Sequence, residues 1–140
     1  VDVLGSDHAP HLKTNKDKIY PNSPSGMPGV QTIFPVMIDH VNNKKLTLNQ
    51  LINLMCENPC KIFGIKNKGF IKEGFDADLT IVDMNKKVTI KNEMIASKCG
   101  WTPFHDHKVK GFPIGTIVNG ILVMSEGKAL VESKGEPLKF

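Results

Sequence analysis

Apolar residues recur along the first half of the chain at spacings that predict one strand followed by helices. The apolar run at residues 1–5 predicts a short buried strand. A polar segment at residues 12–27, rich in Lys, Asn, Ser and Pro, predicts a long loop, and such loops are often functional. Apolar side chains at helical spacing over residues 30–41 then predict a helix, and Pro28 suits its first turn.

Two further helical segments follow. Thr47 and Gln50 have the spacing of a capping box, in which a side chain and a backbone N–H bond reciprocally at a helix start. The apolar pattern behind them predicts an amphipathic helix over residues 47–55. An Asn-Pro pair predicts the start of a third, short helix over residues 58–63, which Gly64 can end.

The second half of the chain has the short alternating apolar runs and tight turns that are typical of antiparallel strands. Strands are predicted at residues 79–82 and 87–90. Residues 115–124 read as a hairpin with an Asn-Gly turn at its centre. A second tight turn at residues 126–128 precedes another apolar run. We therefore expect an α/β chain whose β-rich part follows its helical part.

The composition of the chain argues against several classes of function. The chain has 140 residues, 40% of them hydrophobic, and a net charge of +4. All 18 basic residues are lysines and they are scattered, whereas nucleic-acid readers commonly use arginine. No apolar run reaches the roughly 18 residues of a membrane span, and no export signal is visible. We expect no nucleic-acid or membrane partner and, given three cysteines without a disulfide framework, a reducing cytoplasm.

A carboxylate and two imidazoles stand together just after the first predicted strand. Residues 6–11 read Ser-Asp-His-Ala-Pro-His. Taken singly, Asp7 could be a metal ligand, a general base or a loop cap, and His8 and His11 could be structural. The cluster favours chemistry, because a carboxylate near imidazoles can ligate a divalent metal and take a proton from water.

Three other groups of residues have ordinary structural interpretations. The stretch His105-Asp106-His107 is interpreted as an exposed loop rather than a metal site. Cys56 and Cys60 lie four apart on a helix and are interpreted as small buried residues rather than half of a metal site. Trp101 and Phe104 are interpreted as packing anchors for the connection that contains them.

Residues 7–11 resemble the last-strand motif of dihydroorotases, which belong to the amidohydrolase superfamily. The first motif is specific, and the segments that follow extend the resemblance over the whole chain. These segments are residues 23–29, 58–64, 74–83, 102–104 and 111–127. The resemblance implies that residues 1–66 are the last strand and trailing helices of a (β/α)8 metal-dependent hydrolase barrel. Residues 67–140 would form a small, mainly β domain of composite-sandwich type.

The resemblance also implies roles for single residues. Asp7 would ligate zinc, accept a proton from the attacking hydroxide and pass it to the leaving amide nitrogen. His11 would hydrogen-bond the ring carboxylate of the substrate, and Ala9 would contact the same region through its backbone. Ser25 and Gly26 would line the ring. The implied reaction is the reversible hydrolysis of dihydroorotate to N-carbamoyl-aspartate, a step of pyrimidine biosynthesis.

The other motifs of the family have no match in this chain. These are the His-x-His-x-Arg motif, the bridging lysine or aspartate and the further histidine ligands, and a whole barrel takes about 250 residues. We therefore expect the C-terminal portion of an enzyme, inactive alone, with zinc bound stably only in the complete enzyme. Substrate would bind only together with the missing portion. The chain would form a homo-oligomer or a complex with an N-terminal portion.

Two alternatives stay open. The chain could be a non-catalytic relic or a structural subunit that binds a partner. It could also be part of a dihydropyrimidinase-like or allantoinase-like cyclic amidase. The resemblance of His11 to a dihydroorotase residue favours an anionic substrate, because a buried carboxylate without a donor is costly.

Overall fold

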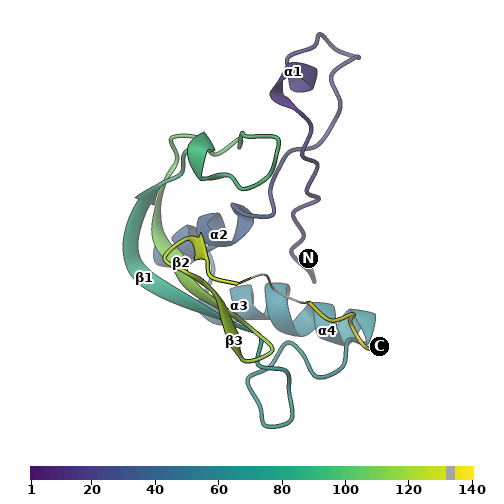
Figure 1. Cartoon of the computed structure of the whole chain (residues 1–140), viewed down its shortest axis with the longest axis vertical. Helices are drawn as coiled ribbons and strands as arrows, with labels where there is room; N and C mark the ends of the chain where they lie inside the picture. The colour runs from purple at the N-terminus through teal and green to yellow at the C-terminus, as the bar shows by residue number, and fades with distance from the viewer. Residues whose placement is uncertain (132–134) are drawn as a thin grey trace.

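The computed structural model describes residues 1–131 and 135–140. They form a curved antiparallel sheet with the helices of residues 33–63 on its concave side (Figure 1). The mixed α/β class predicted above is confirmed, whereas the barrel and sandwich architectures remain predictions. Among the described residues, no helix combines the length and apolar character needed to cross a bilayer.

The strand predicted at the start of the chain is not formed. Residues 1–5 run extended, with Val1 fully exposed and Asp2 and Gly5 also exposed. The Leu4 N–H donates to the Leu54 carbonyl at 3.0 Å, and the Asn58 amide donates to the Asp2 carbonyl at 2.8 Å. A strand needs a neighbouring strand to complete its hydrogen-bond ladder, and the neighbour of this segment is a helix.

The polar loop that follows contains one helical turn, α1 (Lys13–Lys16). The helix predicted behind the loop is α2 (Ile33–Asn42), which begins later than the apolar pattern indicated. The Gly29 carbonyl accepts the N–H groups of Thr32 at 3.1 Å and Ile33 at 2.9 Å, so a turn precedes the helix. Pro28 lies buried before that turn rather than in the helix.

The next two predicted helices form one continuous run, made of α3 (Leu48–Ile52), the π-helical segment η1 (Asn53–Glu57) and α4 (Asn58–Phe63). The capping box at the start is confirmed, with Gln50 N–H 3.1 Å from the Thr47 hydroxyl and Thr47 N–H 2.7 Å from the Gln50 side chain. Gly64 ends the run in a left-handed conformation, as predicted. The run continues into Pro59 because the wider π turn makes room for a residue that clashes with an ordinary α-helix.

Four antiparallel strands form the sheet in the order β1 (Leu79–Thr89), β2 (Lys108–Val118), β3 (Ile121–Ser125) and β4 (Lys128–Ala129). The strands predicted at 79–82 and 87–90 are joined into β1 through an irregularity between Asp83 and Lys87. Both predicted turns are confirmed. Asn119 and Gly120 have φ of 48° and 79° between β2 and β3, which is the turn type that suits twisted hairpins.

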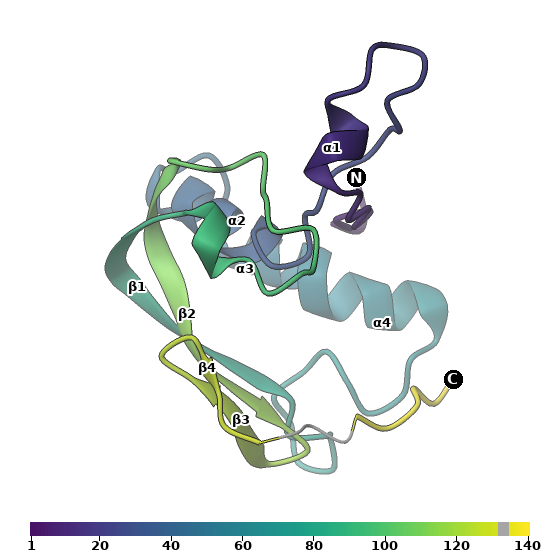
Figure 2. The same cartoon turned by 45° about the horizontal axis from the view of Figure 1, so that its top comes forward.

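The core lies where α2 packs on the sheet (Figure 2). It consists of Val36, Ile90 and Val109, with the partly buried Val88, Phe104 and Phe112 packed against them. A Cβ built on Gly111 of β2 would lie 2.1 Å from Cγ2 of Ile38, so the strand needs a glycine there. A connection over residues 90–107, containing the 3-10 turn η2 (Asn92–Met94), joins β1 to β2. The division at residue 66 remains a prediction.

Candidate functional site

Two of the motifs singled out above lie side by side. The extended segment at residues 6–11 runs parallel to residues 26–29, with a bridge between His8 and Met27. The Ala9 N–H donates to the Met27 carbonyl at 2.9 Å. This pairing places the predicted catalytic and substrate-loop segments in one structural unit.

Gly26 allows this close approach. Its φ is +85°, and a Cβ built on it would lie 2.6 Å from the Cβ of Ala9. Any larger residue would need both an unfavourable conformation and a separation of the two segments. Ser25, the residue before it, is exposed. The structure therefore places Ala9 and Gly26 in contact and leaves the Ser25 side chain open to solvent.

Asp7 presents an exposed carboxylate at the start of the pairing. Its φ is +43°, in the left-handed region that residues other than glycine seldom adopt. Holding such a residue there costs about 1 kcal/mol or more and is often found at functional sites. No described residue donates a hydrogen bond to its carboxylate. The group is therefore free to bind a cation or accept a proton.

The two histidines of the motif differ in their surroundings. The Nδ1 of His8 accepts the backbone N–H groups of Gly29 at 3.2 Å and Val30 at 3.4 Å, so His8 ties the two segments together. His11 is half-buried, and its own N–H donates to the Ala9 carbonyl at 2.9 Å. No described residue hydrogen-bonds the His11 imidazole, which leaves this ring available to a ligand.

A contact that the sequence does not predict holds His11 from the other side. The indole Nε1–H of Trp101 donates to the His11 carbonyl at 2.7 Å. The Lys13 ammonium lies 5.9 Å from the centre of the Trp101 ring. The interpretation of Trp101 as a packing residue omitted this polar role. A signal was present, because a partly buried indole N–H usually finds an acceptor.

A pocket of about 320 Å³ opens next to this unit. One wall comes from His8 and the turn before α2, and the other from residues 95–97 of the connection. The Gln31 side chain joins the two walls, donating to the Met94 carbonyl at 2.6 Å and accepting the Ala96 N–H at 2.9 Å. The connection is therefore fastened to the site at Gln31 as well as at Trp101.

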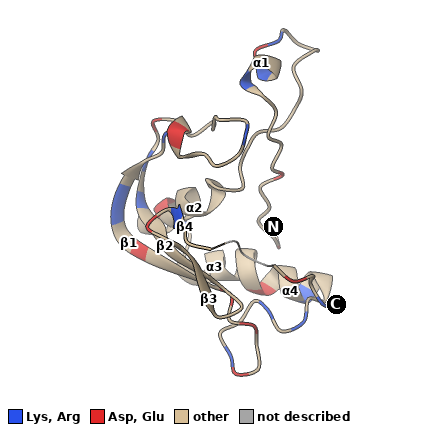
Figure 3. Ribbon diagram, in the orientation of Figure 1, with Lys and Arg blue, Asp and Glu red and all other residues tan. Residues whose placement is uncertain are grey.

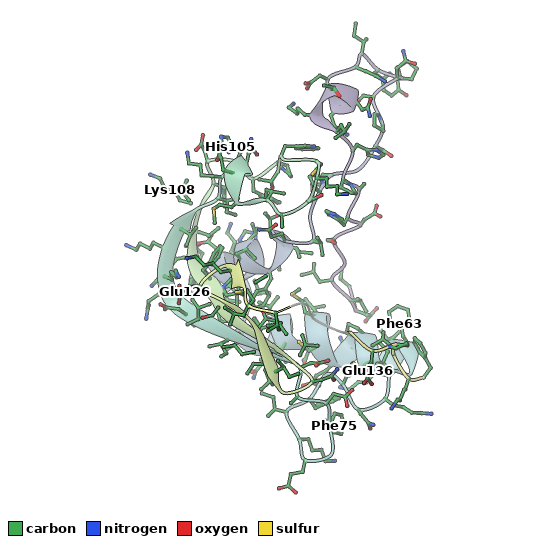
Figure 4. All side chains as sticks on the ribbon, in the orientation of Figure 1. Phe63, Phe75, His105, Lys108, Glu126 and Glu136 are labelled. Atoms are coloured by element: carbon green, nitrogen blue, oxygen red, sulfur yellow. The ribbon has the colours of Figure 1, made fainter. Side chains whose placement is uncertain are left out.

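The alternative metal candidates lie elsewhere. His105 lies beside the outer end of the sheet, near Lys108, and not beside the extended N-terminal segment (Figure 4). His105, Asp106 and His107 are all exposed, as predicted. Asp106 pairs with Lys91, and the Nδ1 of His105 accepts the Asn92 N–H at 3.0 Å. These contacts give the loop a structural role.

The prediction for the helical cysteines is partly wrong. Cys56 is exposed and Cys60 is half-buried. Partial desolvation raises the pKa of the Cys56 thiol, and the neighbouring Cys60 and Glu57 raise it further. A thiol held neutral in this way is a poor nucleophile and a poor metal ligand.

The described residues do not by themselves make up a zinc site. They contain no group of at least three His, Cys, Asp or Glu side chains close enough to share a metal ion. Asp7 offers one carboxylate, while Nδ1 of His8 is already occupied by backbone donors. Any metal bound at Asp7 would need its other ligands from beyond these residues.

Comparison with known proteins shows where this arrangement belongs. The chain is 44% identical over 136 residues to a dihydroorotase of Pyrococcus furiosus, a match that covers 97% of this chain and 32% of that protein. A dihydroorotase of Methanosarcina acetivorans is 42% identical over 128 residues, covering 90% of this chain and 27% of that protein. The chain thus spans about a third of the length of the curated relatives it matches.

Solved structures of other proteins also resemble the chain. An L-hydantoinase (dihydropyrimidinase) from Arthrobacter aurescens superposes with a TM-score of 0.90 at 36% identity, covering 94% of this chain and 30% of that one. A D-hydantoinase superposes with a TM-score of 0.83 at 27% identity over 91% of this chain and 29% of that one. The model of the amidohydrolase family matches residues 2–123. On this evidence the chain belongs to the amidohydrolase family.

Proposed function

We propose that the chain forms the C-terminal part of a dihydroorotase-like amidohydrolase and provides one side of its active site. The observation that carries this proposal is the pairing of residues 6–11 with residues 26–29. Two segments that resemble dihydroorotase motifs lie together, with Ala9 N–H bonded to the Met27 carbonyl at 2.9 Å. Curated relatives with this name support the assignment.

The proposed reaction adds the oxygen of water to the ring amide carbon of dihydroorotate and breaks the bond from that carbon to the ring nitrogen. An Oδ atom of Asp7 accepts a proton from the attacking water and returns it to the leaving nitrogen, so the carboxylate is regenerated. A zinc ion bound in the complete enzyme would supply Lewis-acid activation of the water. We assign that ion a carboxylate ligand in Asp7 and further ligands in the rest of the enzyme.

The substrate is held by the other residues of the paired segments. His11 is proposed to donate from its imidazole to the substrate's ring carboxylate. The Ala9 N–H already donates to the Met27 carbonyl. One lone pair of the Ala9 carbonyl already accepts the His11 N–H. Ala9 would therefore contact the substrate through its backbone, by the remaining lone pair of its carbonyl. Ser25 and Gly26 would line the ring.

A chimera tests the proposal directly. This chain replaces the matching third of the Pyrococcus furiosus relative, which it resembles at 44% identity. We expect turnover of dihydroorotate, and we expect Asp7→Asn to lower kcat by about 10²–10⁴-fold, since the proton acceptor is lost. Asp2→Asn is the matched control, because Asp2 is an exposed acid on the same segment. A folded chimera without turnover, or equal effects of the two substitutions, would contradict the proposal.

The structural likeness to the hydantoinases favours a second candidate, a cyclic amidase that acts on uncharged rings. The same chimera distinguishes the two when it is offered dihydrouracil, hydantoin and allantoin beside dihydroorotate. In a dihydroorotase-like site, His11→Ala raises KM for the anionic substrate alone. A hydantoinase-like site would prefer the uncharged rings, and the substitution would leave that preference unchanged.

A third candidate is a non-catalytic subunit that binds a partner through exposed apolar residues. Ile62, Phe63 and Ile71 are each more than half exposed around α4 and the segment that follows it. In the proposed enzyme these residues are covered by the remaining portion or by another copy of the chain. If this candidate is right, the chain associates stably with its partner and Asp7→Asn leaves that association unchanged.

A further inference from the structure

One hydrogen bond that the proposed function does not explain joins two segments that are 90 residues apart. The indole N–H of Trp101, in the connection between β1 and β2, donates to the His11 carbonyl at 2.7 Å. Trp101 is half-buried and is the only tryptophan of the chain. The indole therefore reaches from the β-rich part to the paired segments of the candidate site.

This contact holds the backbone that carries the His11 ring. On the N-terminal side, the His11 N–H donates to the Ala9 carbonyl at 2.9 Å, and Ala9 is bonded to Met27. On the C-terminal side, the His11 carbonyl is held by Trp101. Because both peptide groups of His11 are bonded, both of its backbone angles are restricted, and these set the direction in which the imidazole leaves the chain.

Trp101 is itself held in place. The next residue, Thr102, is buried, and its N–H donates to the Asn92 side chain at 2.9 Å. The N–H of Phe104 donates to the Thr102 hydroxyl at 3.2 Å, and Phe104 packs on the core. The indole thus extends from a part of the connection that is bonded to its own neighbours and to the core.

We propose that Trp101 is a positioning residue, which sets the orientation of His11 and so tunes the affinity of the site for an anionic substrate. This role rests on the function proposed above, in which the His11 imidazole binds the substrate carboxylate. Trp101 itself touches no substrate. It connects the β-rich part, which is packed on the core, to the segment that carries His11.

The first test uses the chain itself. In exchange measurements by NMR, the single indole N–H should exchange about tenfold or more slowly than in the urea-unfolded chain, because it is hydrogen-bonded. Trp101→Phe should shift the Leu12 amide nitrogen, which shares a peptide group with the His11 carbonyl. Lys98→Gln, a change at an exposed position of the same connection, should leave that resonance in place. Exchange at the unfolded rate would overturn the proposal.

The second test uses the chimera. Trp101→Phe should raise KM for dihydroorotate about three- to tenfold, with kcat nearly unchanged. This is the effect of weakening the single hydrogen bond from His11 to the substrate carboxylate. It should add nothing in a His11→Ala background, because the two residues act through one group. Lys13→Met, which removes the ammonium over the ring, should leave KM unchanged.

A merely structural role for Trp101 would give a different pattern. Trp101→Phe would then lower the amount of active enzyme and the apparent kcat without changing KM, and it would add to His11→Ala. Either result would overturn the positioning role. Absence of turnover in the unsubstituted chimera would count against the proposed function and not against the Trp101 contact, which the NMR measurements decide separately.

Discussion

Single residues of the site combine unusual backbone geometry with unoccupied side chains. Asp7 has a positive φ and a free carboxylate, and Gly26 has a positive φ and a neighbour too close for any side chain. By contrast, His8 has its Nδ1 occupied by two backbone donors. At this scale the proposed chemistry is assigned to Asp7 and His11, while His8 and Gly26 hold the segments that carry them.

The carboxylate of Asp78, away from the site, gives a prediction of how the stability of the fold depends on pH. Lys68 lies 3.0 Å from Asp76 and also pairs with Asp78, and Asp78 accepts the Asn119 N–H at 2.8 Å. The Lys68 hydrogen bond, followed by the Asn119 bond, holds the pKa of Asp78 below its usual value of 3.8. A carboxylate whose pKa is lowered by folding stabilises the fold above that value, and this stability is lost as the pH falls through the folded pKa.

Asp78→Asn should therefore lower the free energy of unfolding at pH 7 by roughly 0.5–1 kcal/mol, an amount already reduced for the partial exposure of the pair. The difference should shrink as the pH falls below about 4. Urea unfolding across this pH range measures it. Asp17→Asn is the control, because Asp17 forms an exposed ion pair with Lys13 on α1. A loss that is the same at pH 7 and at low pH would contradict the assignment.

Close contacts join α2 to β2, in addition to the apolar core that lies between the helix and the sheet. Helix α2 approaches β2 so closely at Gly111 that a Cβ there would lie only 2.1 Å from Cγ2 of Ile38. The Asn42 amide bonds the Lys110 carbonyl at 2.6 Å, and the Lys110 N–H donates to Asp39 at 2.8 Å. These contacts fasten the helix that follows the site to the centre of the sheet.

Gly111→Ala tests this contact against a matched position. Gly74 has a φ of +84°, close to the +96° of Gly111, but has open space around it. Gly74→Ala should cost about 1–2 kcal/mol from conformation alone. Gly111→Ala should cost about 1–3 kcal/mol more, because α2 must shift away from the strand. Equal losses in thermal or urea unfolding would show that α2 and β2 are not in close contact.

The whole molecule leaves much apolar surface exposed. Basic and acidic residues are interspersed over the loops, β1 and the end of α4 (Figure 3). Large apolar side chains are also exposed in several elements. Ile71 is 92% exposed and Phe63 is 59% exposed. Among the described residues, no strand pairs with residues 1–5 either. Surfaces and unpaired edges of this kind favour association with another chain.

We therefore expect the chain alone to associate at micromolar concentration, as dimers or larger species in sedimentation velocity. Replacing Ile62 and Phe63 by serine should shift the distribution toward monomer, because both lie exposed at the end of α4. Thr14→Ser, a polar exposed position on α1, serves as the control. A species that stays monomeric up to high micromolar concentration would contradict this expectation.

Much of the candidate site could be anticipated from the sequence, but its assembly could not. The Asp7 motif and the segment with Gly26 are recognisable as local patterns. Their pairing depends on how the chain folds back, and the spacing of residues along the sequence does not predict this. The bond from Trp101 to His11 is of the same kind, since it joins residues 90 positions apart.

The sequence by itself determined the features that arise between near neighbours. The capping box of Thr47 and Gln50, the left-handed stop at Gly64 and the Asn-Gly hairpin turn each depend on a few adjacent residues. Tertiary structure decided the rest. Residues 1–5 have the composition of a strand and yet form none, because a strand exists only when a neighbour supplies the other half of its hydrogen bonds.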